Sequence, residues 1–90
     1  MVFTWDPKKA ASNLSKHGVG FPEASSVIGD PLASTFPDED HSLAEHRFVT
    51  VGMSRRNRVL VVIHSDQRGA VRIISARKAI RREIEFYENG

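Results

Sequence analysis

The sequence contains no cysteine, and this absence limits both the fold and the chemistry. Disulfide bonds, zinc sites built on thiolates and a cysteine nucleophile are all excluded. Small secreted domains usually depend on disulfides, so a chain of this size without them is more typical of a cytoplasmic protein. We therefore expect a cytoplasmic location and a fold that is held together by its core alone.

Long apolar runs are absent as well. No stretch approaches the roughly 18 residues that a membrane-spanning helix requires, and residues 1–6 lack the basic-then-apolar plan of a signal peptide. The chain has 90 residues, of which 40% are hydrophobic and 27% charged, values typical of a globular protein rather than a disordered one. We expect one domain over residues 1–90, with no membrane partner.

Several familiar site motifs are also missing. The sequence has no P-loop, no GxGxxG and no GxSxG, which argues against nucleotide-cofactor sites and the hydrolase elbow. Its four histidines show no metal-ligand spacing such as HExxH. We therefore expect neither a metal site nor a cofactor.

Charge, by contrast, is distributed unevenly. Residues 1–45 carry three lysines against seven acids, whereas residues 46–90 carry ten cations against four acids, and nine of those ten cations are arginines. The planar donor fork of arginine suits phosphate better than lysine does. The second half therefore favours binding to phosphate groups; the alternative is a solvated basic face with no ligand.

Local patterns predict an α+β fold. We expect strands at residues 2–5, 32–36, 47–53, 59–63 and 70–75, and helices at residues 6–18, 20–29 and from about 76 to 87. Asp6 and Pro7 are typical of a helix start, and Gly18 of a helix end. The short turns at residues 54–57 and 65–69 favour an antiparallel meander. The expected order is β-α-α-β-β-β-β-α, a small antiparallel sheet packed with two N-terminal helices and one C-terminal helix.

The last predicted helix is charged against its dipole. Arg77, Lys78, Arg81 and Arg82 would crowd its positive N-terminal end, at a cost of about 0.3–1 kcal/mol each. An anion bound there would explain the arrangement, so we predict phosphate binding by these residues, with Arg72 on the adjoining strand joining Arg77. The alternative is that the arginines form ion pairs with the acidic N-terminal half. Lys9 repeats the pattern at the first helix.

Three further residues are candidates for proton transfer or phosphate binding. His17 lies at the end of the first helix, where a stabilising role or a proton-transfer role is possible. Glu45 and Arg47 are two residues apart on a predicted strand and so face the same side. They form either a structural ion pair or a base held beside a phosphate-binding cation.

The sequence resembles the BrnT family of toxins over nearly its whole length. The first half carries the resemblance in Phe3-Thr4-Trp5-Asp6, Asn13, Lys16-His17-Gly18-Val19, Phe21, Glu23-Ala24 and Asp30-Pro31. The second half carries it in Glu45-His46-Arg47, Gly52, Arg72-Ile73-Ile74-Ser75-Ala76-Arg77-Lys78-Ala79, Glu83 and Tyr87. The segment from Arg72 to Ala79 is the most specific part.

The resemblance implies a RelE-like ribonuclease fold and the toxin of a type II toxin–antitoxin pair. Such a toxin would be an endoribonuclease that inhibits translation, neutralised by a BrnA-like ribbon-helix-helix antitoxin. Two toxin copies would join an antitoxin dimer in a heterotetramer, which would contact operator DNA only through the antitoxin. A non-catalytic module that binds antitoxin or nucleic acid as a co-repressor is the alternative.

Metal-free RNA cleavage requires cations, a base and an acid around one phosphate. Arg77 and Arg72 suit the cation role, Glu45 or His17 the base, and Tyr87 or His17 the acid. Arg47, Lys9, Lys78 and Arg81 are the remaining candidates for binding RNA phosphates.

Overall fold

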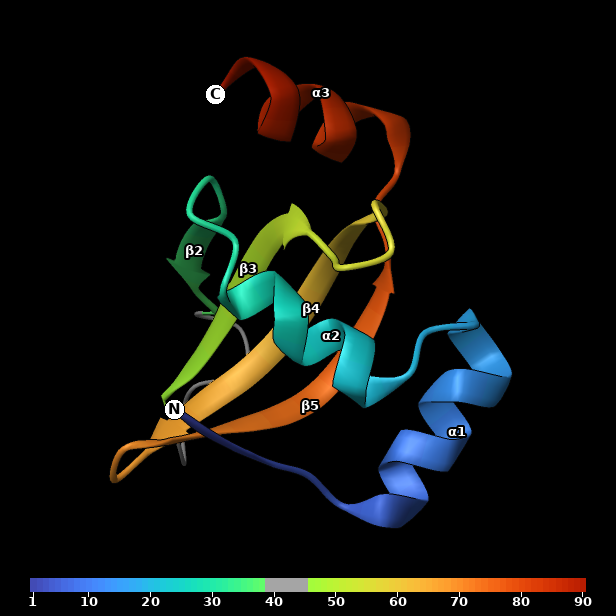
Figure 1. Ribbon diagram of the computed structural model, residues 1–90, viewed down its shortest axis with the longest axis vertical. Coiled ribbons are helices and arrows are strands. Elements are labelled where there is room, and N and C mark those ends of the chain that lie inside the picture. Colours follow the sequence, from blue (N-terminus) through green and yellow to red (C-terminus); the bar gives the residue numbers. More distant parts are fainter. Residues whose placement is uncertain (39–45) are drawn as a thin grey trace.

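The computed structural model describes residues 1–38 and 46–90 and shows three helices beside a twisted sheet (Figure 1). The elements are β1 (Val2–Thr4), α1 (Pro7–His17), α2 (Phe21–Ile28), β2 (Ser34–Pro37), β3 (Arg47–Met53), β4 (Val59–Gln67), β5 (Ala70–Lys78) and α3 (Arg81–Asn89). The strands lie in the order β1-β5-β4-β3-β2. The α+β class expected from the sequence is therefore confirmed.

The sheet is mixed, so the expectation of a purely antiparallel sheet was wrong. Strands β2 to β5 pair antiparallel, but β1 runs parallel to β5 along its outer edge. Short turns force the neighbouring strands β3, β4 and β5 to alternate in direction. β1 is separated from β2 by two helices, which leave it free to join the far edge of the sheet in either direction.

The first helix begins and ends where the sequence predicted. The Asp6 side chain accepts a hydrogen bond of 2.8 Å from the backbone N–H of Lys8, and Pro7 occupies the first turn. Gly18 ends the helix in the left-handed conformation, at φ 68°. At the second helix, Ala24 and Val27 are buried and Ile28 is partly buried. Local capping signals thus fix the position of α1 along the chain, whereas α2 has no side-chain cap and is positioned by its buried residues.

The end of β5 differs from the prediction and changes the setting of two arginines. The last strand continues to Lys78 rather than Ser75, and α3 begins only at Arg81. Residues 75–78 pair with residues 60–63 of the central strand. These ladder hydrogen bonds outweigh the local helix preference of Ala76 to Ala79. Arg77 and Lys78 therefore lie on a strand and not at a helix N-terminus.

Two irregularities shape the β4–β5 hairpin. It turns tightly at Arg68 and Gly69, which have φ angles of 47° and 83°, and this turn is shorter than the expected loop over residues 65–69. Further along, Ile63 pairs with Ser75 and His64 with Ile73, so Ile74 is an extra residue without a partner, as in a β-bulge.

Helices α1 and α2 cover one face of the sheet and form the core with it (Figure 1). The core consists of Val19, Phe21, Ala24, Val27, Leu60, Val62, Val71, Ile73 and Ala76. The sheet and α2 approach so closely that a Cβ atom at Gly52 would lie 3.1 Å from Cγ1 of Val27 on α2. No helix in the described parts of the chain is long and apolar enough to span a membrane.

Candidate functional site

The face of the sheet opposite α1 and α2 carries the candidate residues Arg47, Arg72 and Arg77, and we call it the open face. Since side chains alternate along a strand, the buried Leu60 and Val62 point toward the helices and Val61 and Ile63 point the other way. The strand register then defines the open face as Thr4, Phe36, Arg47, Val49, Val51, Val61, Ile63, Ser65, Arg72, Ser75 and Arg77.

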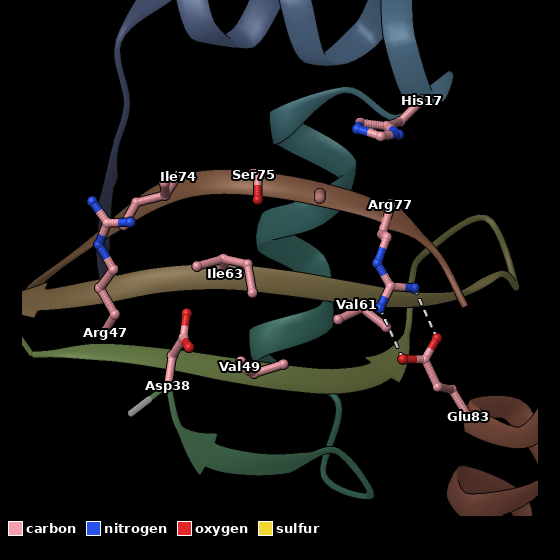
Figure 2. A pocket seen from close by; sticks show the side chains of 11 residues that line it. His17, Asp38, Arg47, Val49, Val61, Ile63, Ile74, Ser75, Arg77 and Glu83 are labelled. Carbon is pink, nitrogen blue, oxygen red and sulfur yellow. Dashed lines mark hydrogen bonds and ion pairs between the residues drawn. The ribbon is translucent and has the colours of Figure 1, made fainter. Parts of the chain in front are cut away.

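A cavity of about 430 Å³ lies on the open face. Figure 2 shows Arg47 at one end of it and Arg77 with Glu83 at the other. Its lining residues are His17, Asp38, Arg47, Val49, Val61, Ile63, Ile74, Ser75, Ala76, Arg77 and Glu83. The cavity therefore combines an apolar floor with cations at both ends, an arrangement that suits a substrate with a flat apolar part and negative charges.

Arg77 is held in place by the protein and still has donors to spare. Its Nη1 and Nη2 donate to the two oxygens of Glu83 at 2.8 and 2.9 Å, and Nη1 also donates to the Lys78 carbonyl at 3.3 Å. A guanidinium has five N–H groups, so Nε–H and one N–H of Nη2 remain. These two share one edge of the group and form a fork of the kind that binds phosphate bidentately.

Glu83 is the residue that fixes this geometry. It lies in the first turn of α3, and its Oε1 also accepts a hydrogen bond of 2.9 Å from the Ile80 backbone N–H. Hydrogen bonds from Arg77 lower the pKa of Glu83, and the same bonds raise the pKa of Arg77. Both groups are therefore charged at neutral pH, and the Arg77 fork has a defined orientation.

This ion pair corrects two expectations. The arginine was expected to pair, if at all, with the acidic N-terminal half, but its partner is Glu83 of the C-terminal helix. Arg77 and Lys78 were also expected to oppose the dipole of that helix. Only Arg81 and Arg82 lie in the first turn of α3, where Glu83 partly offsets them.

His17 reaches the cavity from α1, past the edge of β5 (Figure 2). The helix is fastened to that strand by the buried Asn13, whose side chain bonds both the N–H and the carbonyl of Ala76, at 3.1 and 2.8 Å. A second hollow beside it is lined by Lys9, Ser12, Asn13, Lys16, His17, Ile74 and Ser75. His17 and Lys9 thus extend the basic surface from the cavity onto α1.

Arg47 and Arg72 share another row of the open face. Arg47 on β3 is the register partner of Ser65 on β4, and Ser65 is the partner of Arg72 on β5. Arg72 was expected beside Arg77, but it does not line the cavity. Arg72 pairs with Ser65 on β4, and Arg77 pairs with Val61 on the same strand. These two partners are four residues apart, which is about 13 Å along a strand.

The remaining predicted residues lie elsewhere. The Tyr87 hydroxyl donates to Asp30 at 2.5 Å, which ties α3 to the loop after α2, and this hydrogen bond raises the pKa of Tyr87. Lys78 and Arg81 are exposed and do not line the cavity. Glu45 lies outside the described residues.

Sequence reasoning missed the roles of Glu83 and Asn13. Glu83 was noticed only as part of the family resemblance, because its contact with Arg77 spans a strand end and a helix start. Asn13 offered a signal, because it is an uncharged amide in the middle of a helix that has lysines in its first and last turns. In the structure its side chain is buried, with 6% of the residue exposed. Within the described ranges, no group of three or more histidine, aspartate or glutamate side chains is arranged to hold a metal ion.

Comparison with known proteins addresses the identity of the chain. A family model described as "Ribonuclease toxin, BrnT, of type II toxin-antitoxin system" matches residues 5–83. The crystal structure of the ribonuclease toxin BrnT from Brucella abortus is similar, with a TM-score of 0.69 and 25% identity, over 90% of this chain and 100% of that one. No curated protein matches. The chain therefore belongs to the BrnT family of ribonuclease toxins of type II toxin–antitoxin systems.

Proposed function

We propose that this chain is a metal-independent endoribonuclease that acts in the cytoplasm, cleaves RNA and so inhibits translation. The observation that carries this proposal is the Arg77 fork, which Glu83 orients without occupying and which lines the cavity beside His17. A RelE-like relationship of the fold is part of the same proposal. The ribonuclease description of the family supports it.

The proposed reaction is attack of a ribose 2′-hydroxyl on the neighbouring phosphate. A new P–O bond forms to the 2′-oxygen while the bond to the 5′-oxygen of the next nucleotide breaks, which leaves a 2′,3′-cyclic phosphate. Negative charge accumulates on the phosphate oxygens, and the free edge of Arg77 would stabilise it by two charge-assisted hydrogen bonds. Because Glu83 holds the guanidinium in advance, no reorganisation is required when the charge develops.

Proton transfer is assigned to His17, whose imidazole lines the cavity and is a side chain suited to donating or accepting a proton. We propose that it protonates the leaving 5′-oxygen. Glu45, two residues before Arg47, is the proposed base for the 2′-hydroxyl. Tyr87 has no part in this mechanism, because its proton is shared with Asp30 and its raised pKa makes it a poorer acid.

The experiment that tests this function is cleavage of a defined single-stranded RNA by the purified chain, with and without EDTA. Activity should survive the chelator and leave 2′,3′-cyclic phosphate ends, and Arg77→Ala should abolish it. Arg55→Ala is the matched control, because Arg55 is exposed in the β3–β4 turn and does not line the cavity. Activity that is lost in chelator and restored by a divalent ion would refute the metal-independent mechanism.

A type II system implies an antitoxin, and we propose that this partner is a BrnA-like ribbon-helix-helix protein that covers the open face. Two toxin copies and an antitoxin dimer would form the resting complex, with operator DNA bound through the antitoxin. The cationic second half of the chain supports this placement. Arg47→Glu and Arg77→Glu should each weaken the complex, increasingly so at low salt; equal affinity at every salt concentration would contradict it.

A further inference from the structure

We propose that Arg47, Ser65 and Arg72 form a second phosphate-binding subsite, which holds the same RNA strand at a second phosphate about 13 Å from the Arg77 row. The proposal rests on the function proposed above and deepens it. It assigns Arg72 to positioning the substrate rather than to the reacting phosphate. It also predicts that the substrate must reach beyond a single dinucleotide.

The first observation is the composition of one row across four strands. Arg47 on β3, Ser65 on β4, Arg72 on β5 and Thr4 on β1 are successive register partners, so their side chains share the open face. The row contains two guanidinium groups and two hydroxyl groups, and the Asp38 carboxylate follows at its β2 end, next to Arg47. Its two arginines are two strand spacings apart, or about 10 Å between Cα atoms. An anion between them would be within reach of both side chains.

The second observation is an unused donor in the middle of the row. Ser65 is fully buried at 0% exposure, and its Oγ has no hydrogen-bond partner in the described structure. Buried hydroxyl groups nearly always have a partner, so an orphan of this kind requires a reason. Figure 2 shows the Arg47 side chain running across β4 toward β5. A phosphate held at its tip would lie over β4, where Ser65 would supply a further hydrogen bond.

The third observation concerns Arg72 itself. Its side chain is partly buried, yet it makes no hydrogen bond or ion pair with any residue that the structure describes. The nearest acid along β4, Asp66, belongs to the opposite face, where it lies 3.6 Å from the ring of His64. Asp38 lies at the Arg47 end of the cavity, where its N–H donates to the Arg47 carbonyl, and it does not pair with Arg72. The charge of Arg72 is therefore available to a ligand.

The spacing of the two subsites fits one strand of RNA. A stacked strand advances about 3.4 Å per nucleotide, so about 13 Å corresponds to about four stacked nucleotides, and to fewer where the strand is extended. The floor between the rows is apolar, formed by Val49, Val61 and Ile63. A base turned toward this floor would be unpaired, so the ligand is single-stranded.

The test uses a single-stranded RNA hexanucleotide and a dinucleotide, together with a 2′-O-methyl hexanucleotide that cannot be cleaved. In Arg72→Ala, kcat/KM for the hexanucleotide should fall about tenfold relative to kcat/KM for the dinucleotide. The cause should be an increase in KM for the hexanucleotide. Binding of the uncleavable hexanucleotide should weaken by the same factor, and the slope of log affinity against log salt should decrease by about one. Arg72→Lys should restore the slope but only part of the affinity. Ser65→Ala should weaken binding about threefold.

Several outcomes would overturn the subsite. The ratio could stay at its original value, or Arg72→Ala could lower kcat equally on both substrates, which would place Arg72 at the reacting phosphate. A loss of the same size in Arg55→Ala would show a general charge effect. If Arg72→Ala weakens binding of the uncleavable hexanucleotide while no form of the chain cleaves RNA, the proposed ribonuclease function fails and the subsite stands.

Discussion

On the helix-covered side of the sheet, the Glu23 carboxylate is 4% exposed and accepts hydrogen bonds from Ser54 and from two nitrogens of Arg58. On the open face, Arg72 has no such partner among the described residues, and Arg77 keeps one edge free. The covered side therefore uses its charged groups to hold the protein together. The open face keeps part of its charge for a ligand, and mutations on the two sides should have separable effects.

Adjacent residues of β5 show the same contrast. Ala76 is 2% exposed, and both of its backbone groups are bound by Asn13 of α1. The Arg77 side chain, one residue later, is 43% exposed and faces the cavity. A rigid strand therefore carries the cation, and this rigidity is what a preorganised site requires.

The largest effect is expected at Arg77. Arg77→Ala should reduce RNA cleavage about 10²–10³-fold, which corresponds to about 3–4 kcal/mol of transition-state stabilisation. The free energy of unfolding should fall by less than about 1 kcal/mol, because the lost ion pair with Glu83 is partly exposed and screened by solvent. Cleavage assays and thermal unfolding on one preparation check both values. A variant that still arrests growth, or that loses activity only as it unfolds, would remove Arg77 from the site.

The covered side should respond in the opposite way. Arg58→Ala leaves the buried Glu23 carboxylate with a hydrogen bond from Ser54 and the exposed Arg56 at 3.8 Å, and should cost about 2–3 kcal/mol of unfolding free energy. Thermal unfolding should show a decrease of about 10 °C or more in Tm, whereas kcat of the folded fraction should change little. Arg55→Ala provides the control for loss of one charge. A decrease in kcat without a decrease in Tm would mean that the two sides are not separable.

Glu83 connects the helix to the site, so its loss should be intermediate. Glu83→Ala releases the Arg77 guanidinium from its two hydrogen bonds and should lower kcat about tenfold, with KM nearly unchanged, because orientation and not charge is lost. Glu83→Gln keeps one acceptor and should fall between Glu83→Ala and the unmodified chain. An increase in kcat would instead identify Glu83 as a competitor of the substrate phosphate.

The smallest effect concerns pH and belongs to the covered side. Burial lowers the pKa of His64 below its ordinary value, and the nearby Asp66 only partly opposes this. Because the folded pKa is below the unfolded one, the unfolded chain takes up protons first. Stability is therefore fully present above about pH 6.5 and declines as pH falls below it. Thermal unfolding between pH 7.5 and 5 should show this decline, and His64→Gln should reduce it. Equal pH dependence in both proteins would contradict the assignment.

Local sequence signals were sufficient to predict most helices and strands, but not how the strands pair. The start of α1 at Asp6 and Pro7 and its end at Gly18 follow from capping chemistry that acts within a few residues. The parallel attachment of β1, and the continuation of β5 to Lys78, depend on hydrogen bonds between strands far apart in the sequence. No local pattern carries that information.

The candidate site, like the fold, could be predicted from the sequence only in part. Charge and residue type selected Arg77, Arg47 and His17, which the fold brings to one cavity. Type alone could not distinguish them from Lys78 and Arg81, because this depends on which face of which element each residue occupies. Tyr87 illustrates the difficulty: its hydroxyl suits acid chemistry, but a contact 57 residues away, with Asp30, occupies it.

The extra residue at Ile74 has a consequence for how this sequence tolerates length changes. Arg72 and Arg77 are five positions apart, an odd interval that in a regular strand would send their side chains to opposite sides. The bulge reverses the alternation once, so both arginines emerge on the open face. Removing the single codon for Ile74 would take away the bulge and shorten the interval to four positions, so regular alternation would still bring both arginines to the open face. Removing any other residue between the two arginines while the bulge remains would instead turn Arg77 into the apolar core. Length changes in this strand are therefore tolerated at the bulge itself.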